Sequence, residues 1–255
     1  MVKQVLEMSC ATDVGAVRKG NEDSVAVFPQ LNLAILADGM GGHKAGEIAS
    51  RRAIEVVRDA VRDGLNIKSA VVRANSEVYL LSTTDEAYSG MGTTLVAAHY
   101  DGVKVSIVCV GDSRLYRFRN NQFEQITVDQ TVAQDMKDNN IEHTNGKHVS
   151  SFEHVLTNAL GIQPECRVEL KQDVMQPGDI HLLCSDGLTG VLNDEFIADS
   201  IRNRSSTLEG VIQNLFDAAL RRLAPDNISV AMVHANTLRR VNEKLSLSEH
   251  SLSEF

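Results

Sequence analysis

Tryptophan is absent from this 255-residue chain, and aromatic residues make up only 4% of it. The chain therefore has few aromatic side chains on which nucleic acid bases could stack. The formal net charge of -9 also provides no basic surface for a nucleic acid backbone or an anionic membrane. We therefore expect neither nucleic acid nor membrane among the binding partners.

Long apolar runs are missing as well. No run approaches the roughly 18 residues of a membrane-spanning helix, and the N-terminus lacks the pattern of a secretory signal. The expected location is the cytoplasm. The four cysteines, Cys10, Cys109, Cys166 and Cys184, show no Cys-x-x-Cys spacing. This pattern predicts reduced thiols and no disulfide framework.

The composition is that of a folded globular protein, with 43% hydrophobic and 23% charged residues. No internal repeat or linker precedes residue 235, so residues 1–235 are expected to form one domain. Residues 236–255 are polar and rich in serine, which predicts a flexible tail. A monomer is the expected oligomeric state.

Short-range patterns indicate hairpins of strands and pairs of helices. Asp101-Gly102 and Asn120-Asn121 are typical of tight turns, and each separates two strand-like segments. Two helices follow each other across a short link near Gly64, which makes them antiparallel neighbours. The predicted class is α+β with antiparallel sheets. The predicted strands are residues 5–12, 25–28, 33–37, 94–100, 104–110, 114–119, 122–128, 180–184 and 228–233, and the predicted helices are residues 47–63, 67–81, 131–137 and 208–223.

The apolar run Leu33–Ala37 is typical of a strand buried on both faces, and Asp38 follows it directly. Glycines at positions 39, 41 and 42 either permit a close approach of backbone or adopt positive φ. Taken alone, the stretch is also consistent with an ordinary strand-to-helix connection that carries a helix cap. Aspartates elsewhere in the chain decide between these interpretations.

Four aspartates lie at boundaries between an apolar strand and a polar turn. Asp38, Asp112 and Asp186 each follow a predicted strand and have a glycine beside them. Asp226 instead precedes a strand. Each alone is consistent with a turn or a cap. Gathered at one edge of a sheet, however, their carboxylates would repel one another unless divalent cations lay between them.

The chemistry of these ligands favours a hard cation. All donors are oxygen atoms, and no Cys or His stands at zinc-like spacing, so Mg²⁺ or Mn²⁺ is expected. Two such ions about 4 Å apart can lower the pKa of a bridging water and hold a phosphoryl oxygen. Arg18 would then bind the remaining phosphate oxygens with its planar fork.

Other phosphate chemistries lack the residues that they need. A thiol phosphatase requires Arg six positions after its Cys, and none of the four cysteines has it. The Asp-x-Asp motif of aspartyl-phosphate enzymes is missing, and Gly146-Lys147 has Ile141 where a P-loop needs glycine. A two-metal hydrolase is the phosphate chemistry for which the sequence carries a full set of residues.

Six short motifs occur in the order found in the metal-dependent PP2C (PPM) serine/threonine phosphatases, and the chain resembles that family over roughly residues 8–235. The resemblance implies an α-β-β-α sandwich, in which two antiparallel sheets face each other and a pair of antiparallel helices covers each outer side. The Met-Gly-Gly-His form is similar to the bacterial branch, whose members oppose eukaryotic-like Ser/Thr kinases. The motifs are Arg18-x-x-Asn21-Glu22-Asp23, Asp38-Gly39-Met40-Gly41-Gly42-His43, Gly92-Thr93-Thr94, Gly111-Asp112-Ser113-Arg114, Ser185-Asp186-Gly187 and Asp226-Asn227.

The resemblance also implies a dinuclear metal centre with Mn²⁺ or Mg²⁺. Asp38 would bridge both ions, and the carbonyl oxygen of Gly39 would bind one of them. Asp186 and Asp226 would complete the ligand set of the two core ions. Asp112, together with Asp186, would hold a weaker third ion.

Other residues have supporting roles in the family. Glu22 and Asp23 would act through metal-bound waters, and Arg18 would bind the substrate phosphate. Residues near 130–160 would form a flap beside the site, which is the part of the fold that varies most.

The general acid is the one role for which the resemblance names no residue. Eukaryotic members carry a histidine directly after Asp-Gly, whereas this chain has Met40, which has no proton to donate. His43 is close in sequence, but the family's motif does not assign it that role. A metal-bound water near Asp112 is the alternative, so the acid stays unassigned.

The implied function is hydrolysis of phosphoserine and phosphothreonine in proteins. The partners would be phosphorylated proteins and a cognate Ser/Thr kinase. The alternative is a catalytically silent module of the same fold that binds a phosphoprotein. Because every metal-binding aspartate of the motifs is present, the enzyme is favoured.

Overall fold

The computed structural model describes residues 5–41, 44–141, 143–144, 147–203 and 207–236. The strands are β1 (Val5–Asp13), β2 (Asp23–Phe28), β3 (Leu33–Met40), β4 (Gly92–Thr93), β5 (Leu95–Asp101), β6 (Lys104–Val110), β7 (Arg114–Arg119), β8 (Gln122–Gln125), β9 (His143–Thr144), β10 (Lys147–His148), β11 (Glu169–Val174), β12 (Ile180–Cys184) and β13 (Ile228–Asn236). The α-helices are α1 (Lys44–Arg62), α2 (Ile67–Thr84), α3 (Val132–Asp138), α4 (Asp186–Thr189), α5 (Asp194–Arg202) and α6 (Leu208–Arg221).

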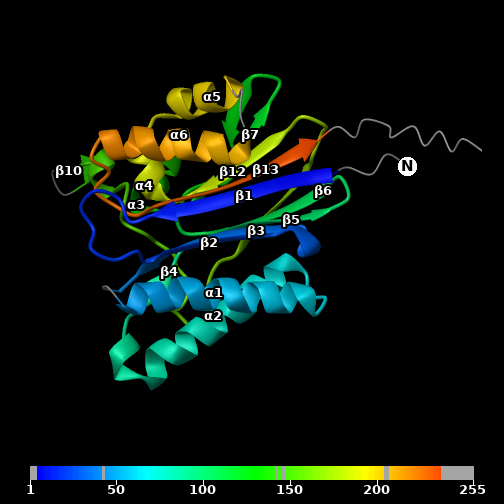
Figure 1. Ribbon diagram of the computed structural model, residues 1–255. Helices are drawn as coiled ribbons and strands as arrows, with labels where there is room; N and C mark the ends of the chain where they lie inside the picture. The colour runs from blue at the N-terminus through cyan, green and yellow to red at the C-terminus, as the bar shows by residue number, and fades with distance from the viewer. Residues whose placement is uncertain (1–4, 42–43, 142, 145–146, 204–206, 237–255) are drawn as a thin grey trace, which may run out of the picture.

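Two antiparallel sheets face each other, and helices cover both outer faces (Figure 1). One sheet has the order β1-β13-β12-β7-β8, and the other has the order β11-β6-β5-β3-β2 with β4 paired to the end of β3. In Figure 1, α1 and α2 lie below the second sheet, and α5 and α6 lie above the first. The predicted α-β-β-α sandwich is confirmed.

Strand β3 shows why this sequence forms four layers. Leu33, Ile35 and Ala37 belong to the core between the sheet and α1 and α2. Ala34 and Leu36, which point the other way, belong to the core between the two sheets. All five side chains are fully buried, so burial on both faces stabilises a strand that reads as one continuous apolar run. A third apolar layer joins the first sheet to α5 and α6.

The predicted turns match the conformations that their residues favour. Asp101 pairs with Lys104 across a turn in which Gly102 has a φ of 60°. Asn120 and Asn121 both adopt positive φ, at 50° and 64°, in the turn between β7 and β8. Two successive left-handed residues give the turn a twist that suits a β-hairpin.

The prediction that the strand ends before Asp38 is wrong, because β3 continues to Met40. Asp38 lies opposite Asp23 in the ladder with β2, and Gly39 lies opposite Thr93 of β4. The polar and glycine residues suggested a loop, but neighbouring strands on both sides keep the backbone extended. The chain turns only at Gly41, which has a φ of 123°.

The longest elements that were not predicted are β11 and α5, and the short elements β4, β9, β10 and α4 were not predicted either. Strand β11 is an edge strand with an unusual pattern, since Leu170 and Val174 are exposed while the charged Asp173 faces inward. Such inward charges are a device by which edge strands avoid pairing with other molecules. The predicted strand at residues 122–128 is also too long, because β8 ends at Gln125.

Some predictions fall on residues outside the described ranges, namely those for Gly42, His43, part of the segment near 130–160 and nearly all of the tail. All four cysteines lie within the described ranges and all are free. Among the described residues, no helix is both long enough and apolar enough to cross a membrane.

Candidate active site

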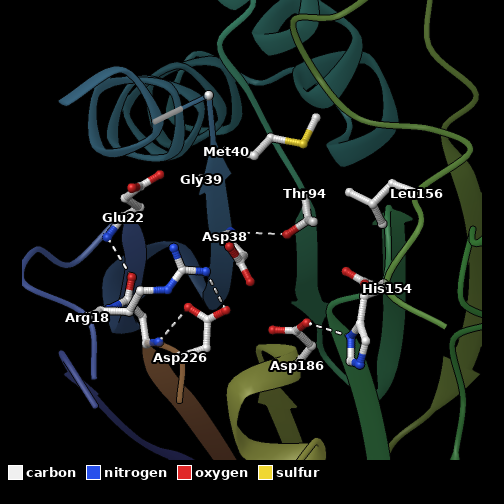
Figure 2. A pocket seen from close by; sticks show the side chains of 13 residues that line it. Arg18, Glu22, Asp38, Gly39, Met40, Thr94, His154, Leu156, Asp186 and Asp226 are labelled. Carbon is white, nitrogen blue, oxygen red and sulfur yellow. Dashed lines mark hydrogen bonds and ion pairs between the residues drawn. The ribbon is translucent and has the colours of Figure 1, made fainter. Parts of the chain in front are cut away.

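A cavity of about 380 Å³ opens at the end of the sandwich where β3 ends and β13 begins. Figure 2 shows the carboxylates of Asp38, Asp186 and Asp226 converging in it from three separate elements. Among the described residues, the predicted site residues that line the cavity are Arg18, Glu22, Asp38, Gly39, Asp112, Asp186 and Asp226. The structure therefore brings together residues that are up to 208 positions apart in sequence.

Asp38 is held by its backbone, which leaves its carboxylate directed into the cavity (Figure 2). The amide of Asp38 donates a hydrogen bond to Thr94 Oγ1 over 3.0 Å. Its carbonyl oxygen accepts bonds from the Thr94 amide and from Thr93 Oγ1, both at 2.8 Å. The Gly-Thr-Thr motif thus fixes the position of Asp38, a role that the sequence did not reveal.

Gly39 is required because other backbone lies against it. A β-carbon at this position would lie 2.1 Å from the carbonyl oxygen of Gly46 in α1 and 2.6 Å from that of Glu22. Of the two roles expected for these glycines, Gly39 permits a close approach of neighbouring backbone, whereas Gly41 adopts positive φ. The chain does not turn at Gly39, because β3 still continues there.

Asp186 and Asp226 occupy the two sides of the cavity below Asp38 in Figure 2. Asp186 is the first residue of the short helix α4, and Ser185 at the N-cap position is the one residue between it and β12. Asp226 lies two residues before β13. Asp112 lies in the turn between β6 and β7, and it lines a neighbouring cavity together with Arg114 and Asp129, which form a bidentate ion pair.

Asp23 is buried and is not among the described residues that line the cavity. It is 7% exposed, and its Oδ2 accepts a hydrogen bond from Ser185 Oγ over 2.8 Å. The amide of Ser229 donates in turn to Ser185 Oγ. Asp23 therefore joins the strand that carries Asp38 to the segments that carry Asp186 and Asp226.

The electrostatics of the cluster call for cations. Burial and the neighbouring carboxylates raise the pKa of Asp38 well above its usual range, and they raise that of Asp186 as well. Burial, with Asp186 and Asp129 nearby, raises the pKa of Asp112 to about 7. Burial likewise raises the pKa of Asp23 to about 6. The raised pKa values mean that these carboxylates are not easily ionised together. A divalent cation would stabilise their charged forms, and ligands that are all oxygen atoms suit Mg²⁺ or Mn²⁺.

Arg18 reaches the cavity from the loop between β1 and β2. Its Nη2 lies 2.8 Å from Asp226 Oδ2, and its side chain is 52% exposed. Asn227 fastens this loop, since its Nδ2 donates to the carbonyl oxygens of Val14 and Gly20. The Glu22 amide donates to Asn227 Oδ1 over 2.9 Å. Asn227 is thus a positioning residue for Arg18 and Glu22, which its place in the Asp-Asn motif did not reveal.

His154 is the site residue that the sequence analysis missed. Its Nδ1 lies 3.2 Å from Asp186 Oδ2 (Figure 2), and one ligand atom each from Asp112, His154 and Asp186 lie within 4.8 Å of one another. These three residues could hold a further cation. His154 falls in the segment near 130–160 that was predicted to flank the site, but no spacing within that segment distinguishes it.

The upper wall of the cavity is apolar. Met40 and Leu156 lie there on either side of Thr94 (Figure 2). Met40 has no exchangeable proton, so the position that follows Asp-Gly cannot supply a general acid. Its thioether instead offers a contact surface to a substrate.

Comparisons with known proteins agree with this geometry. A family model described as protein phosphatase 2C matches residues 17–226. The serine/threonine phosphatase stp of Listeria welshimeri is 30% identical over 249 residues, which cover 90% of this chain and 96% of that protein.

Solved structures show the same arrangement. The crystal structure of the Mycobacterium tuberculosis serine/threonine phosphatase PstP/Ppp has a TM-score of 0.83 and 33% identity, and the match covers 91% of this chain and 99% of that one. A structure of the catalytic domain of PstP in complex with two manganese ions has a TM-score of 0.81, with 33% identity over 91% of this chain and 99% of that one. Since the matched family model spans most of the sequence, this chain belongs to the protein phosphatase 2C family.

Proposed function

We propose that this protein removes phosphate from phosphoserine and phosphothreonine residues of other proteins, with water as the nucleophile and two Mn²⁺ or Mg²⁺ ions as cofactors. The observation that carries the proposal is the convergence of Asp38, Asp186 and Asp226 with Arg18 in one open cavity. The names of the relatives as serine/threonine phosphatases, and the two manganese ions in one of them, support it. A cognate Ser/Thr kinase is the proposed counterpart in the cell.

Each carboxylate has a role that follows from its place. Asp38 lies between Asp186 and Asp226 in Figure 2, so it would be a ligand of both ions, and the Gly39 carbonyl would bind one of them. When bound, the two ions would supply an activated water and neutralise charge on the phosphoryl oxygens. Asp186 and Asp226 would complete the set of residues that hold the ions.

Residues around the core ligands orient them. Glu22 lines the cavity and would act through an intervening water. Asp23, which is buried next to the site, would contact the ions through water, and its hydrogen bond with Ser185 would help to position the neighbouring Asp186. Asp112, with Asp186 and His154, would hold a third, weaker ion.

Arg18 would bind the phosphate group of the substrate. Its guanidinium is exposed and lies at the cavity wall, where two N–H groups can face two phosphate oxygens. By positioning the phosphate group, Arg18 would lower the entropic part of the activation barrier, although it would not itself take part in bond making.

The test is metal-dependent hydrolysis of p-nitrophenyl phosphate and of a phosphothreonine peptide by the full chain. We expect activity with Mn²⁺ that falls at least about a thousandfold in Asp38→Ala and Asp186→Ala, equivalent to about 4 kcal/mol of transition-state stabilisation. Asp101→Asn, at an exposed position at the end of β5, is the matched control. A wild type as inert as both variants, with either metal, would favour a silent module that only binds phosphoproteins.

A further inference from the structure

A second cavity, of about 300 Å³, opens directly beside the catalytic one. The two cavities share His154, Asp186 and Asp226 as lining residues, so they lie next to each other. We call the second one the flanking cavity. Its remaining wall comes from α4, from the residues that follow it, and from the loop before β13.

The remaining wall is apolar. Val191 packs against the core between the first sheet and its helices, and Pro225 is exposed at the rim. Gly187 and Gly190 contribute no side chains. None of the described residues that line this cavity is Lys or Arg. A second phosphate or an acidic side chain would therefore have no cationic partner in it.

Glycine at positions 187 and 190 is explained by different features of the structure. A β-carbon on Gly187 would lie 1.9 Å from the Asn227 carbonyl oxygen, so packing requires glycine. Gly190 has φ and ψ of -68° and -20°, a conformation open to any residue, and it is exposed. A β-carbon on Gly190 would lie 3.1 Å from the carbonyl oxygen of Asp186, which is a close contact, and the absence of a side chain leaves space in the flanking cavity.

We propose that the flanking cavity binds the uncharged, apolar side chain of a residue two positions from the phosphorylated residue in the substrate protein. This inference rests on the proposed function. Side chains of an extended peptide alternate between its two sides, so the nearest residues that point the same way as the phosphorylated one lie two positions away, about 7 Å along the chain. The surfaces left to contact it are then those of Val191 and Pro225.

Charge excludes the other occupants. In the proposed centre, Asp186 and Asp226 are engaged by divalent cations, so they offer no free negative charge to a lysine or arginine. An acidic side chain would lose its hydration without gaining a hydrogen-bonding cationic partner. An aliphatic side chain gives up no hydrogen bonds to water when it enters the cavity, and its apolar surface is buried there.

The experiment compares phosphothreonine peptides that differ only at the positions two residues before and two residues after the phosphothreonine. With the full chain and Mn²⁺, kcat/KM is measured for Val, Gly, Lys and Asp at each position, with p-nitrophenyl phosphate as a substrate that lacks neighbours. We expect Val to exceed Gly about 5- to 20-fold at one of the two positions, with Lys and Asp below Gly.

Two variants locate the preference. Val191→Glu should bring the ratio of Val to Gly close to one and raise the relative kcat/KM of the Lys peptide. Gly190→Val, at an exposed position, should fill the cavity and reduce the same ratio at least threefold. Val72→Glu is the matched control on the exposed side of α2, and its peptide ratios should equal those of the wild type.

The outcomes separate the two proposals. If the wild-type protein hydrolyses p-nitrophenyl phosphate and its kcat/KM values for all peptides agree within twofold, the proposed role of the flanking cavity is wrong and the proposed phosphatase function stands. Wild-type protein that hydrolyses neither kind of substrate would overturn both. A preference for Val that survives in Gly190→Val would also refute the assignment, because the preference would then arise elsewhere. The wild-type series decides even if a variant does not fold.

Discussion

Arg18 Nη2 donates a hydrogen bond to Asp226 Oδ2 over 2.8 Å, so the proposed phosphate-binding residue contacts a proposed metal ligand. The two side chains are 52% and 36% exposed. An ion pair this exposed contributes at most about 1 kcal/mol to stability. Arg18 can therefore leave Asp226 for a phosphate group at little cost, and the contact is suited to exchange.

Replacement of Arg18 by Ala should raise KM for a phosphothreonine peptide about 10- to 100-fold, while kcat falls less. The reason is that the arginine positions phosphate and makes no bond to the ions. Arg18→Lys should lie in between, because an ammonium cannot form the bidentate contact. Steady-state kinetics with Mn²⁺ check this. Loss of Mn²⁺ binding by calorimetry in Arg18→Ala would show instead that the arginine organises the metal site.

Without metal, the protein should lose stability as pH rises from about 5 to 8. Burial raises the pKa of Asp23 to about 6 and that of Asp112 to about 7, whereas both titrate near 4 in the unfolded chain. An acid whose pKa is higher in the folded state stabilises the fold at low pH, and this contribution disappears as pH rises through the folded value. The loss is of the order of 2 to 4 kcal/mol, or about 5 to 10 °C in Tm.

Thermal unfolding in chelator across this pH range measures the effect. Mn²⁺ should restore stability, and most strongly at pH 8, where the carboxylates are charged. Asp112→Asn removes one of the buried charges and should flatten the metal-free curve. A metal-free Tm that is constant or rises with pH would contradict the electrostatic account.

His154→Ala should weaken the most loosely bound Mn²⁺ ion about tenfold, because the imidazole offers a ligand atom near those of Asp112 and Asp186. Calorimetric titration with Mn²⁺ resolves this step from the tighter ones. His148→Ala is the matched control, since His148 is also an exposed histidine of this segment and does not line the described cavities. Identical titrations for the two variants would remove His154 from the metal centre.

A polar contact between the two sheets should matter for stability and not for catalysis. His181 is fully buried, with Nδ1 3.1 Å from the Tyr100 hydroxyl and Nε2 3.7 Å from Asp173 Oδ2. The His181 imidazole, the Val174 amide and Arg117 hold the pKa of Asp173 well below its usual range. Asp173→Asn should therefore lower the free energy of unfolding by about 2 kcal/mol at neutral pH.

This stabilisation has a defined pH window. Because the folded pKa of Asp173 is depressed, its contribution is complete above about pH 5 and declines as pH falls below the unfolded value near 4. Urea unfolding at pH 6 and pH 3 should show the gap between wild type and Asp173→Asn becoming smaller. Asp101→Asn serves again as the exposed control, and a gap independent of pH would mean that lost packing explains the effect.

The sequence predicted the central elements best where an apolar run is bounded by turn residues. The bounds of β6, β7 and β12 agree to the residue, because Gly102, Asn120 and the turn that ends at Asp179 leave little choice. It failed for β11, whose inward charges are satisfied by Arg117 on the opposite sheet. A pattern that depends on a tertiary partner is not visible in a window of neighbouring residues.

The site shows the same division. The order of the motifs identified the carboxylates, since their chemistry requires those residue types. It could not show that Asp23 lies opposite Asp38 in a strand pair, because register is a property of two strands. Nor could it identify His154, whose relation to Asp186 depends on how a variable segment folds back.

The pairing of Asp23 with Asp38 in one ladder has a consequence for how such a site can change. Inserting or deleting one residue within β2 would shift the pairing by one position and turn its side chains to the opposite face. Every proposed metal ligand would still be present in the sequence, yet the arrangement of the carboxylates would be lost. The loop between β1 and β2 is held differently, by the hydrogen bonds of Asn227, so a change in its length would displace Arg18 and Glu22 and leave the pairing of Asp23 with Asp38 intact.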